Sequence, residues 1–154
     1  MNPEQKIKDL GLVLPSGSPP AANYANAVRS GNLLFLAGKS PLPENGILPK
    51  GRLGSEFTVE DGYRFARSAG INLLAALRLE LGSLDRVARV VEVQGFVNAT
   101  EEFEEHAQVL NGCSDLFVDV FEQRGVHARS VLGASSLRGG LPIVVKAIVE
   151  VTEA

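Results

Sequence analysis

The chain has 154 residues, a net charge of −3, and hydrophobic and charged fractions of 45% and 21%, which are ordinary for a globular protein. The acidic balance provides no basic surface for phosphate backbones and argues against nucleic-acid binding, and the single cysteine excludes an internal disulfide. No apolar segment reaches the length of a signal peptide or a membrane span, so we expect a cytoplasmic single domain over residues 1–154 with no membrane contact.

The N-terminal segment is expected to contain a short helix and a loop. Residues 6–14 alternate charged and apolar side chains, and they predict a short helix that runs into an extended piece. Residues 15–20 (PSGSPP) predict a surface loop, because Pro and Gly interrupt regular structure. Residues 1–19 therefore form an N-terminal extension and loop of the domain, too short to fold alone.

A β-hairpin and a long loop are expected next. Residues 24–38 predict the hairpin, with its turn at residues 30–32 (SGN) and a fully apolar second strand. Residues 41–57 contain many Gly and Pro and few apolar side chains, so they predict an irregular loop. Loops of this length in a compact domain often border a functional site.

Two helices follow along the chain. Thr58 opens the first, because Thr58 and Asp61 match a capping box with Asp in the place of Glu. Apolar residues recur at helical spacing until Gly82, which is expected to end this helix as a C-cap. The second helix is expected to begin at residues 98–100 and to end at Gly125.

Three strands are predicted around and after the second helix. Residues 87–97 are rich in β-branched residues, and Gly95 is expected to mark a β-bulge there. Residues 127–137 and 142–151 predict two further strands, joined by a turn at residues 138–140 (RGG).

Charged side chains on these last two strands are the most informative residues of the chain. In the final strand one face is wholly apolar and the other carries Lys146 and Glu150. In the preceding strand Arg129 and His127 share a face by the same period of two. A guanidinium on an otherwise apolar strand must be paired when buried, so Arg129 requires an explanation.

The order of elements, β-β-α-β-α-β-β, predicts an α+β fold. Two helices that cover one face of a mixed sheet form a two-layer sandwich. The other face still needs cover, and the final strands have apolar residues on both faces. We therefore expect that other subunits supply this cover and that the protein is an oligomer.

The chain resembles the RidA/YjgF family of reactive-intermediate deaminases, also known as L-PSP endoribonuclease-like proteins. The resemblance runs from about residue 20 to residue 151 and rests on Tyr24, the segment GNLLFLAGKSPL (31–42), the ARS triplet (128–130) and the strand KAIVEV (146–151). It implies a chorismate-mutase-like homotrimer with ligand-binding clefts between subunits. It also implies a small carboxylate as the ligand, such as an imino or keto acid, and neither a cofactor nor a metal is expected.

Four residues match the family's substrate-binding positions. The arginine of the ARS triplet clamps the carboxylate of the substrate, which assigns that role to Arg129, and a planar guanidinium suits bidentate binding of a carboxylate. The resemblance places Tyr24 and Gly38 in the same pocket. It also places Asn111 there, if the helix contains one extra turn before this residue.

Three positions depart from the family pattern, and they concern the chemical step. Lys146 stands where deaminases of the family carry a water-orienting glutamate, His127 replaces a proline, and Val131 replaces a cysteine. Imine hydrolysis needs a positioned water and a proton for the departing amine. Lys146 could serve as a base only if its pKa fell substantially, whereas His127 could lend a proton; both are candidate catalytic residues.

Several alternatives remain open for these residues and for the function. Arg129 could instead form a structural ion pair with Glu92 or Glu150, Lys146 could be a solvated strand residue, and Asn111 could be a surface residue of its helix. The first function is hydrolysis of 2-imino or enamino acids to 2-keto acids and ammonia. The alternative is a non-catalytic trimer that binds carboxylates, and a third reading, an L-PSP-type endoribonuclease, is disfavoured by the acidic charge.

Overall fold

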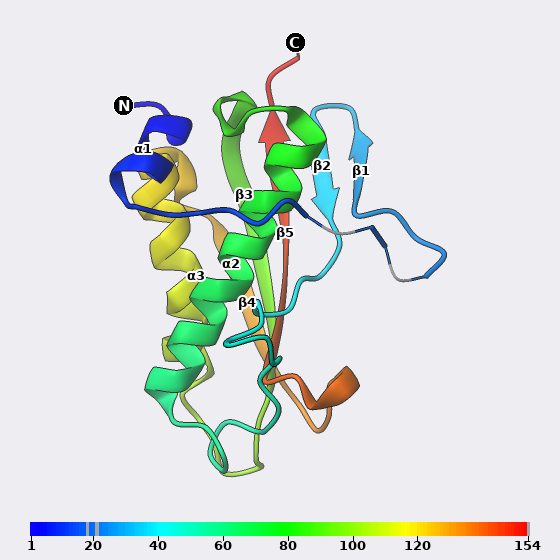
Figure 1. The fold of residues 1–154 in the computed structure, drawn as a ribbon, viewed down its shortest axis with the longest axis vertical. Coiled ribbons are helices and arrows are strands. Elements are labelled where there is room, and N and C mark those ends of the chain that lie inside the picture. The colour runs from blue at the N-terminus through cyan, green and yellow to red at the C-terminus, as the bar shows by residue number, and fades with distance from the viewer. Residues whose placement is uncertain (18, 21, 154) are drawn as a thin grey trace.

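The computed structural model describes residues 1–17, 19–20 and 22–153 (Figure 1). Ser18, within the loop expected at residues 15–20, lies outside the described residues. The main elements along the chain are α1 (Pro3–Asp9), β1 (Ala27–Ser30), β2 (Leu33–Leu36), α2 (Val59–Leu81), β3 (Val87–Asn98), α3 (His106–Phe121), β4 (Ala128–Ala134) and β5 (Ile143–Val151). The short 3₁₀ segments η1 (Leu84–Arg86), η2 (Glu122–Gly125) and η3 (Arg138–Gly140) connect them. No helix in the described part of the chain is long and apolar enough to cross a membrane.

The five strands form one mixed sheet in the order β1-β2-β5-β3-β4. β4 runs parallel to β3, and the other neighbouring strands are antiparallel. The last two strands of the chain, β4 and β5, are therefore not neighbours, because β3 lies between them (Figure 1). The segment that joins them, which contains η3, crosses the end of β3. This order places β4 at one edge of the sheet and the β1–β2 hairpin at the other.

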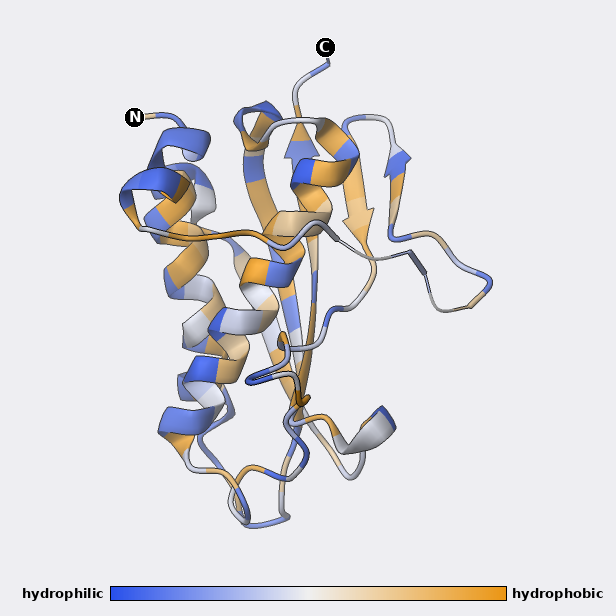
Figure 2. Cartoon of the chain, in the orientation of Figure 1, coloured by the Kyte–Doolittle hydropathy of each residue, from blue (hydrophilic) through white to orange (hydrophobic). Residues whose placement is uncertain are grey.

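Helices α2 and α3 pack side by side on one face of the sheet and bury the core. The capping box predicted at Thr58 and Asp61 is present, and Gly82 ends α2 in the left-handed conformation with φ of 82°. Hydrophobic and hydrophilic residues alternate along both helices (Figure 2), as expected when one side of each helix packs against a sheet. The two-layer α+β architecture expected from the order of elements is confirmed.

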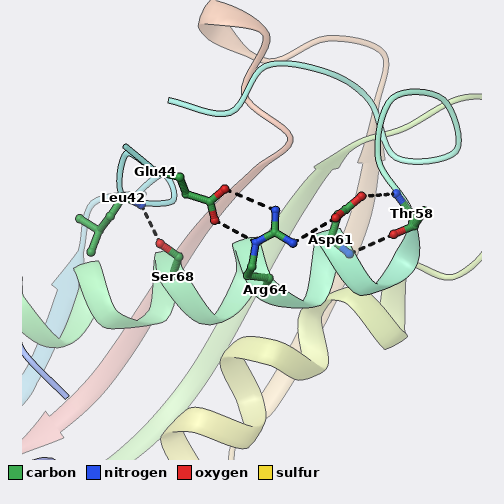
Figure 3. A network of polar contacts seen from close by, with 6 residues as sticks. All are labelled: Leu42, Glu44, Thr58, Asp61, Arg64 and Ser68. Atoms are coloured by element: carbon green, nitrogen blue, oxygen red, sulfur yellow. Dashed lines mark hydrogen bonds and ion pairs between the residues drawn. The ribbon is translucent and has the colours of Figure 1, made fainter. Parts of the chain in front are cut away.

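The long loop predicted at residues 41–57 is held against α2 by polar contacts (Figure 3). Arg64 donates to the carboxylate of Glu44 in the loop and to that of Asp61 in its own helix, at 2.9 and 3.0 Å. The hydroxyl oxygen of Ser68 accepts a hydrogen bond from the amide of Leu42 at 2.8 Å. These contacts fix the loop on the helix although it has little regular structure.

Two local predictions for β3 and α3 are wrong. The bulges of β3 lie between Val87 and Arg89 and between Val90 and Glu92, whereas Gly95 pairs in register with β5. A Cβ at Gly95 would lie 2.8 Å from a methyl of Leu110, so close packing of α3 explains the glycine.

The second helix begins at His106 and not at residues 98–100. Asn98 is the last residue of β3, and it is buried, with its amide nitrogen donating to the carbonyl oxygen of Leu141. Its backbone also bonds to Leu53 and to Pro142. Pairing with these neighbours extends the strand to Asn98, the residue where the helix was expected to begin.

The face of the sheet opposite the helices, called the open face here, exposes apolar side chains. Val28, Phe35 and Leu132 are 57%, 41% and 50% exposed on β1, β2 and β4. Lys146 and Glu150 of β5 lie on the same face, since they alternate with the buried residues of that strand. An apolar surface of this kind is typical of a face that another subunit covers.

Candidate functional site

The side chain of Arg129 lies on the helix face of β4, at the edge of the sheet. Arg129 pairs with Val93 of β3, which is fully buried beneath the helices, so both side chains lie on that face. One terminal nitrogen (Nη1) donates to the hydroxyl oxygen of Ser114 at 3.0 Å, and the other (Nη2) donates to the carbonyl oxygen of Ala107 at 3.3 Å. Both partners belong to α3, so Arg129 connects the edge strand to the helix.

Arg129 has no carboxylate partner among the residues that the structure describes. The ion pairs considered from the sequence, with Glu92 or Glu150, are not formed, because the register places both carboxylates on the open face. A guanidinium has five N–H donors, and two are used by Ser114 and Ala107. Three donors therefore remain for a ligand.

His127 precedes β4, and its ring lies on the same side of the sheet as Arg129. Its Nδ1 lies 2.6 Å from the carbonyl oxygen of Gly125, and its Nε2 lies 2.9 Å from the hydroxyl oxygen of Ser114. Burial lowers the pKa of His127, the nearby charge of Arg129 lowers it further, and the Gly125 carbonyl opposes both. The neutral imidazole is therefore favoured.

Asn111 lies on the same side of α3 as the two contacts of Arg129. Ala107, Asn111 and Ser114 follow one another at spacings of four and three residues, which places them on one stripe of the helix. Asn111 is half-buried. The structure thus brings Arg129 and His127 together between β4 and α3, and Asn111 lies one turn from their shared partner Ser114.

The other three predicted site residues lie elsewhere in the chain. Lys146 is exposed on the open face, in the row that it forms with Gln94 of β3. Tyr24 precedes β1 and Gly38 follows β2, so both lie toward the opposite edge of the sheet from β4. Within one chain, the predicted site residues are therefore divided between the two edges of the sheet and between its helix face and its open face.

Ser114 is the polar residue of this site that sequence reasoning missed. It contacts both Arg129 and His127. A signal was present, because Ser114 lies three residues after Asn111 and shares its helix face. Its neighbour Cys113 is fully buried, as expected for a core residue, and burial raises the pKa of its thiol to about 12.

Two cavities lie at the end of the sheet where β3 stops, away from Arg129. One of about 590 Å³ is lined by Lys50, Arg52, Asn98 and Ser135, among others. A second, of about 250 Å³, shares Arg52 and Ser135 and includes His106. The long loop predicted to border a site does border these cavities, but none of the six predicted site residues lines either of them.

Comparisons with known proteins agree with this fold. The family model described as "YjgF/chorismate mutase-like, putative endoribonuclease" matches residues 4–145. Protein TCP17 of Trypanosoma cruzi is 39% identical over 145 residues, which cover 94% of this chain and 91% of that protein. The chain therefore belongs to the YjgF/chorismate-mutase-like family, as the resemblance in the sequence indicated.

Solved structures share nearly the whole architecture. The protein Atu1372 of Agrobacterium tumefaciens, titled as of unknown function, matches with a TM-score of 0.89 and 35% identity over 97% of this chain and 92% of that chain. A structure from Shewanella oneidensis, titled "a putative endoribonuclease", matches with a TM-score of 0.93 and 28% identity over 98% of this chain and 100% of that chain.

Proposed function

We propose that this protein binds small carboxylates at Arg129 and hydrolyses 2-imino or enamino acids to 2-keto acids and ammonia. The observation that supports the proposal most is the state of the guanidinium, which has three free donors and no acidic partner in the described chain. A carboxylate is the anion that such a planar group binds best with two parallel hydrogen bonds.

The site is completed between subunits of a homotrimer in this proposal. Tyr24 and Gly38 lie toward the edge of the sheet that is opposite to Arg129, and Lys146 lies on the opposite face. Four strand spacings, about 19 Å, separate β1 from β4. A single chain cannot bring these residues to one small ligand, whereas a second copy packed on the exposed apolar face can supply them.

The chemical step requires a base for the attacking water and an acid for the departing amine. In this proposal His127 takes this role, because its ring lies on the side of Arg129, whereas Lys146 takes part only from a neighbouring subunit. An imine hydrolase that lacks the glutamate of the family's deaminases therefore depends on its histidine.

The second candidate is a non-catalytic trimer that binds a carboxylate in the same cleft. The specific observation that favours it is Lys146, since an ammonium at this position removes a base and repels an iminium. An endoribonuclease remains disfavoured, because the net charge of −3 does not attract RNA.

A coupled assay separates the candidates. An amino-acid oxidase generates the imine, and release of the keto acid is followed with and without the protein. Acceleration supports the deaminase, whereas binding of a keto acid without acceleration supports the non-catalytic trimer. Lys146→Glu is expected to raise turnover, and a decrease would show that the lysine has a role of its own.

A further inference from the structure

The hydroxyl of Ser114 links the guanidinium of Arg129 to the imidazole of His127. Its oxygen lies 3.0 Å from Nη1 of Arg129 and 2.9 Å from Nε2 of His127. Ser114 is half-buried in the middle of α3, and the two residues that it contacts come from β4 and from the segment just before it. Side chains from α3, from β4 and from the residue just before β4 thus form one hydrogen-bonded row.

The direction of each hydrogen bond in this row is fixed by the groups at its ends. The carbonyl of Gly125 can only accept, so Nδ1 of neutral His127 carries the proton and donates it. Nε2 is then an acceptor, and the Ser114 hydroxyl donates to it. Arg129 can only donate, so its N–H points at the Ser114 oxygen.

This arrangement leaves the Ser114 oxygen able to accept one more hydrogen bond. A hydroxyl oxygen has two lone pairs, and Arg129 uses one of them. A water bound there would lie beside the ligand on Arg129, whose reacting carbon is bonded directly to the carboxyl carbon that the guanidinium holds. A single water therefore suffices to connect Ser114 to that carbon.

We propose that Ser114 is a further catalytic residue, which relays a proton between the attacking water and His127. This proposal rests on the imine hydrolysis proposed above. In that reaction Ser114 and His127 take over the water-activating role of the glutamate that the family's deaminases carry. Ser114 takes a proton from the water as it passes its own proton to Nε2 of His127.

The proton balance of the reaction closes with these residues alone. The water oxygen forms a bond to the imine carbon, the C=N electron pair moves to nitrogen, and the proton released by the water reaches His127 through Ser114. The imidazolium then returns this proton through Ser114 to the amine nitrogen. The product of this addition is a carbinolamine. The same relay takes its hydroxyl proton and delivers it to the nitrogen as the C–N bond breaks, so the 2-keto acid and ammonia leave and His127 is neutral again.

The surroundings of His127 suit a base. Arg129 is the charged group that faces it from β4, while η2 contributes the Gly125 carbonyl and α3 contributes the Ser114 hydroxyl and the edge of the Phe117 ring. Burial and Arg129 both lower the pKa of His127 below 6.5. The imidazole is therefore neutral near pH 7 and can accept a proton.

Ser114→Ala, measured in the coupled imine assay, tests the relay. We expect kcat/KM to fall by about 10²-fold, the lower end of the range for acid–base catalysis. Binding of pyruvate, followed by calorimetry, should change by less than about tenfold, because Arg129 keeps its hydrogen bond to the Ala107 carbonyl and its donors for the carboxylate. Ser16→Ala removes the same hydroxyl from an exposed position of the N-terminal loop, and this matched control should keep wild-type turnover.

His127→Gln provides a second variant with a different readout. In the wild type kcat/KM should fall at acidic pH, as His127 becomes protonated at its lowered pKa, and this acid limb should disappear in the variant. Wild-type turnover in Ser114→Ala would overturn the relay and leave the deaminase proposal standing. A wild type that binds pyruvate but hydrolyses no imine would overturn both.

Discussion

Arg129 and Lys146 lie on opposite faces of the same sheet, on strands that are separated by β3. Arg129 shares a row with Val93 and Ala147 beneath the helices, whereas Lys146 shares a row with Gln94 and Ser130 on the open face. The two positions that the family resemblance assigns to one pocket therefore cannot meet in a single chain. Contact between them requires a second subunit.

The first prediction concerns the guanidinium. Arg129→Ala should weaken binding of a 2-keto acid by about 1.5–3 kcal/mol, the typical value of a hydrogen bond to a charged group, measured by calorimetry. Arg129→Lys should also weaken binding, because an ammonium keeps the charge but not the planar fork. Loss of the folded state in Arg129→Ala would show that the residue is structural.

The second prediction concerns the open face. Phe35→Asp places a charge among the exposed apolar residues of this face and should convert the proposed homotrimer to single chains, measured by light scattering after gel filtration. Val118→Asp, which is also partly exposed but lies on α3, should leave the assembly intact. An unchanged mass for Phe35→Asp would rule out the open face as the interface.

The third prediction concerns stability between pH 7 and 5. The pKa of His127 is lowered in the folded state, so the unfolded chain binds more protons in this window and stability falls as the pH falls through 6.5. The stability of His127→Gln should fall less over the same range, as measured by urea unfolding at each pH. Parallel curves for the two proteins would contradict the lowered pKa.

The fourth prediction concerns the packing of α3, the helix that carries Ser114, against α2. A methyl group at Gly112 of α3 would meet the carbonyl oxygen of Tyr63 in α2. Gly112→Ala should therefore destabilise the fold by at least about 2 kcal/mol, although Ala is about 1 kcal/mol better than Gly in an isolated helix. Gln108→Ala, at an exposed position of α3, should change stability by less than about 0.5 kcal/mol. Chemical denaturation measures both.

The sequence by itself determined the elements whose signals are local. The alternation in β5, the capping box at Thr58 and the glycine at position 82 each depend on residues a few positions apart. Together they fixed the order of strands and helices and the two-layer class. The family membership followed from short motifs of the same kind.

Only the tertiary structure decided which side chains meet. β3 lies between β4 and β5, so Arg129 and Lys146 are placed on opposite faces, and α3 brings Ser114 to His127 and Arg129. The same packing extended β3 through Asn98 against a local helix signal. These outcomes depend on hydrogen bonds and packing between segments far apart in the chain, which a local pattern does not encode.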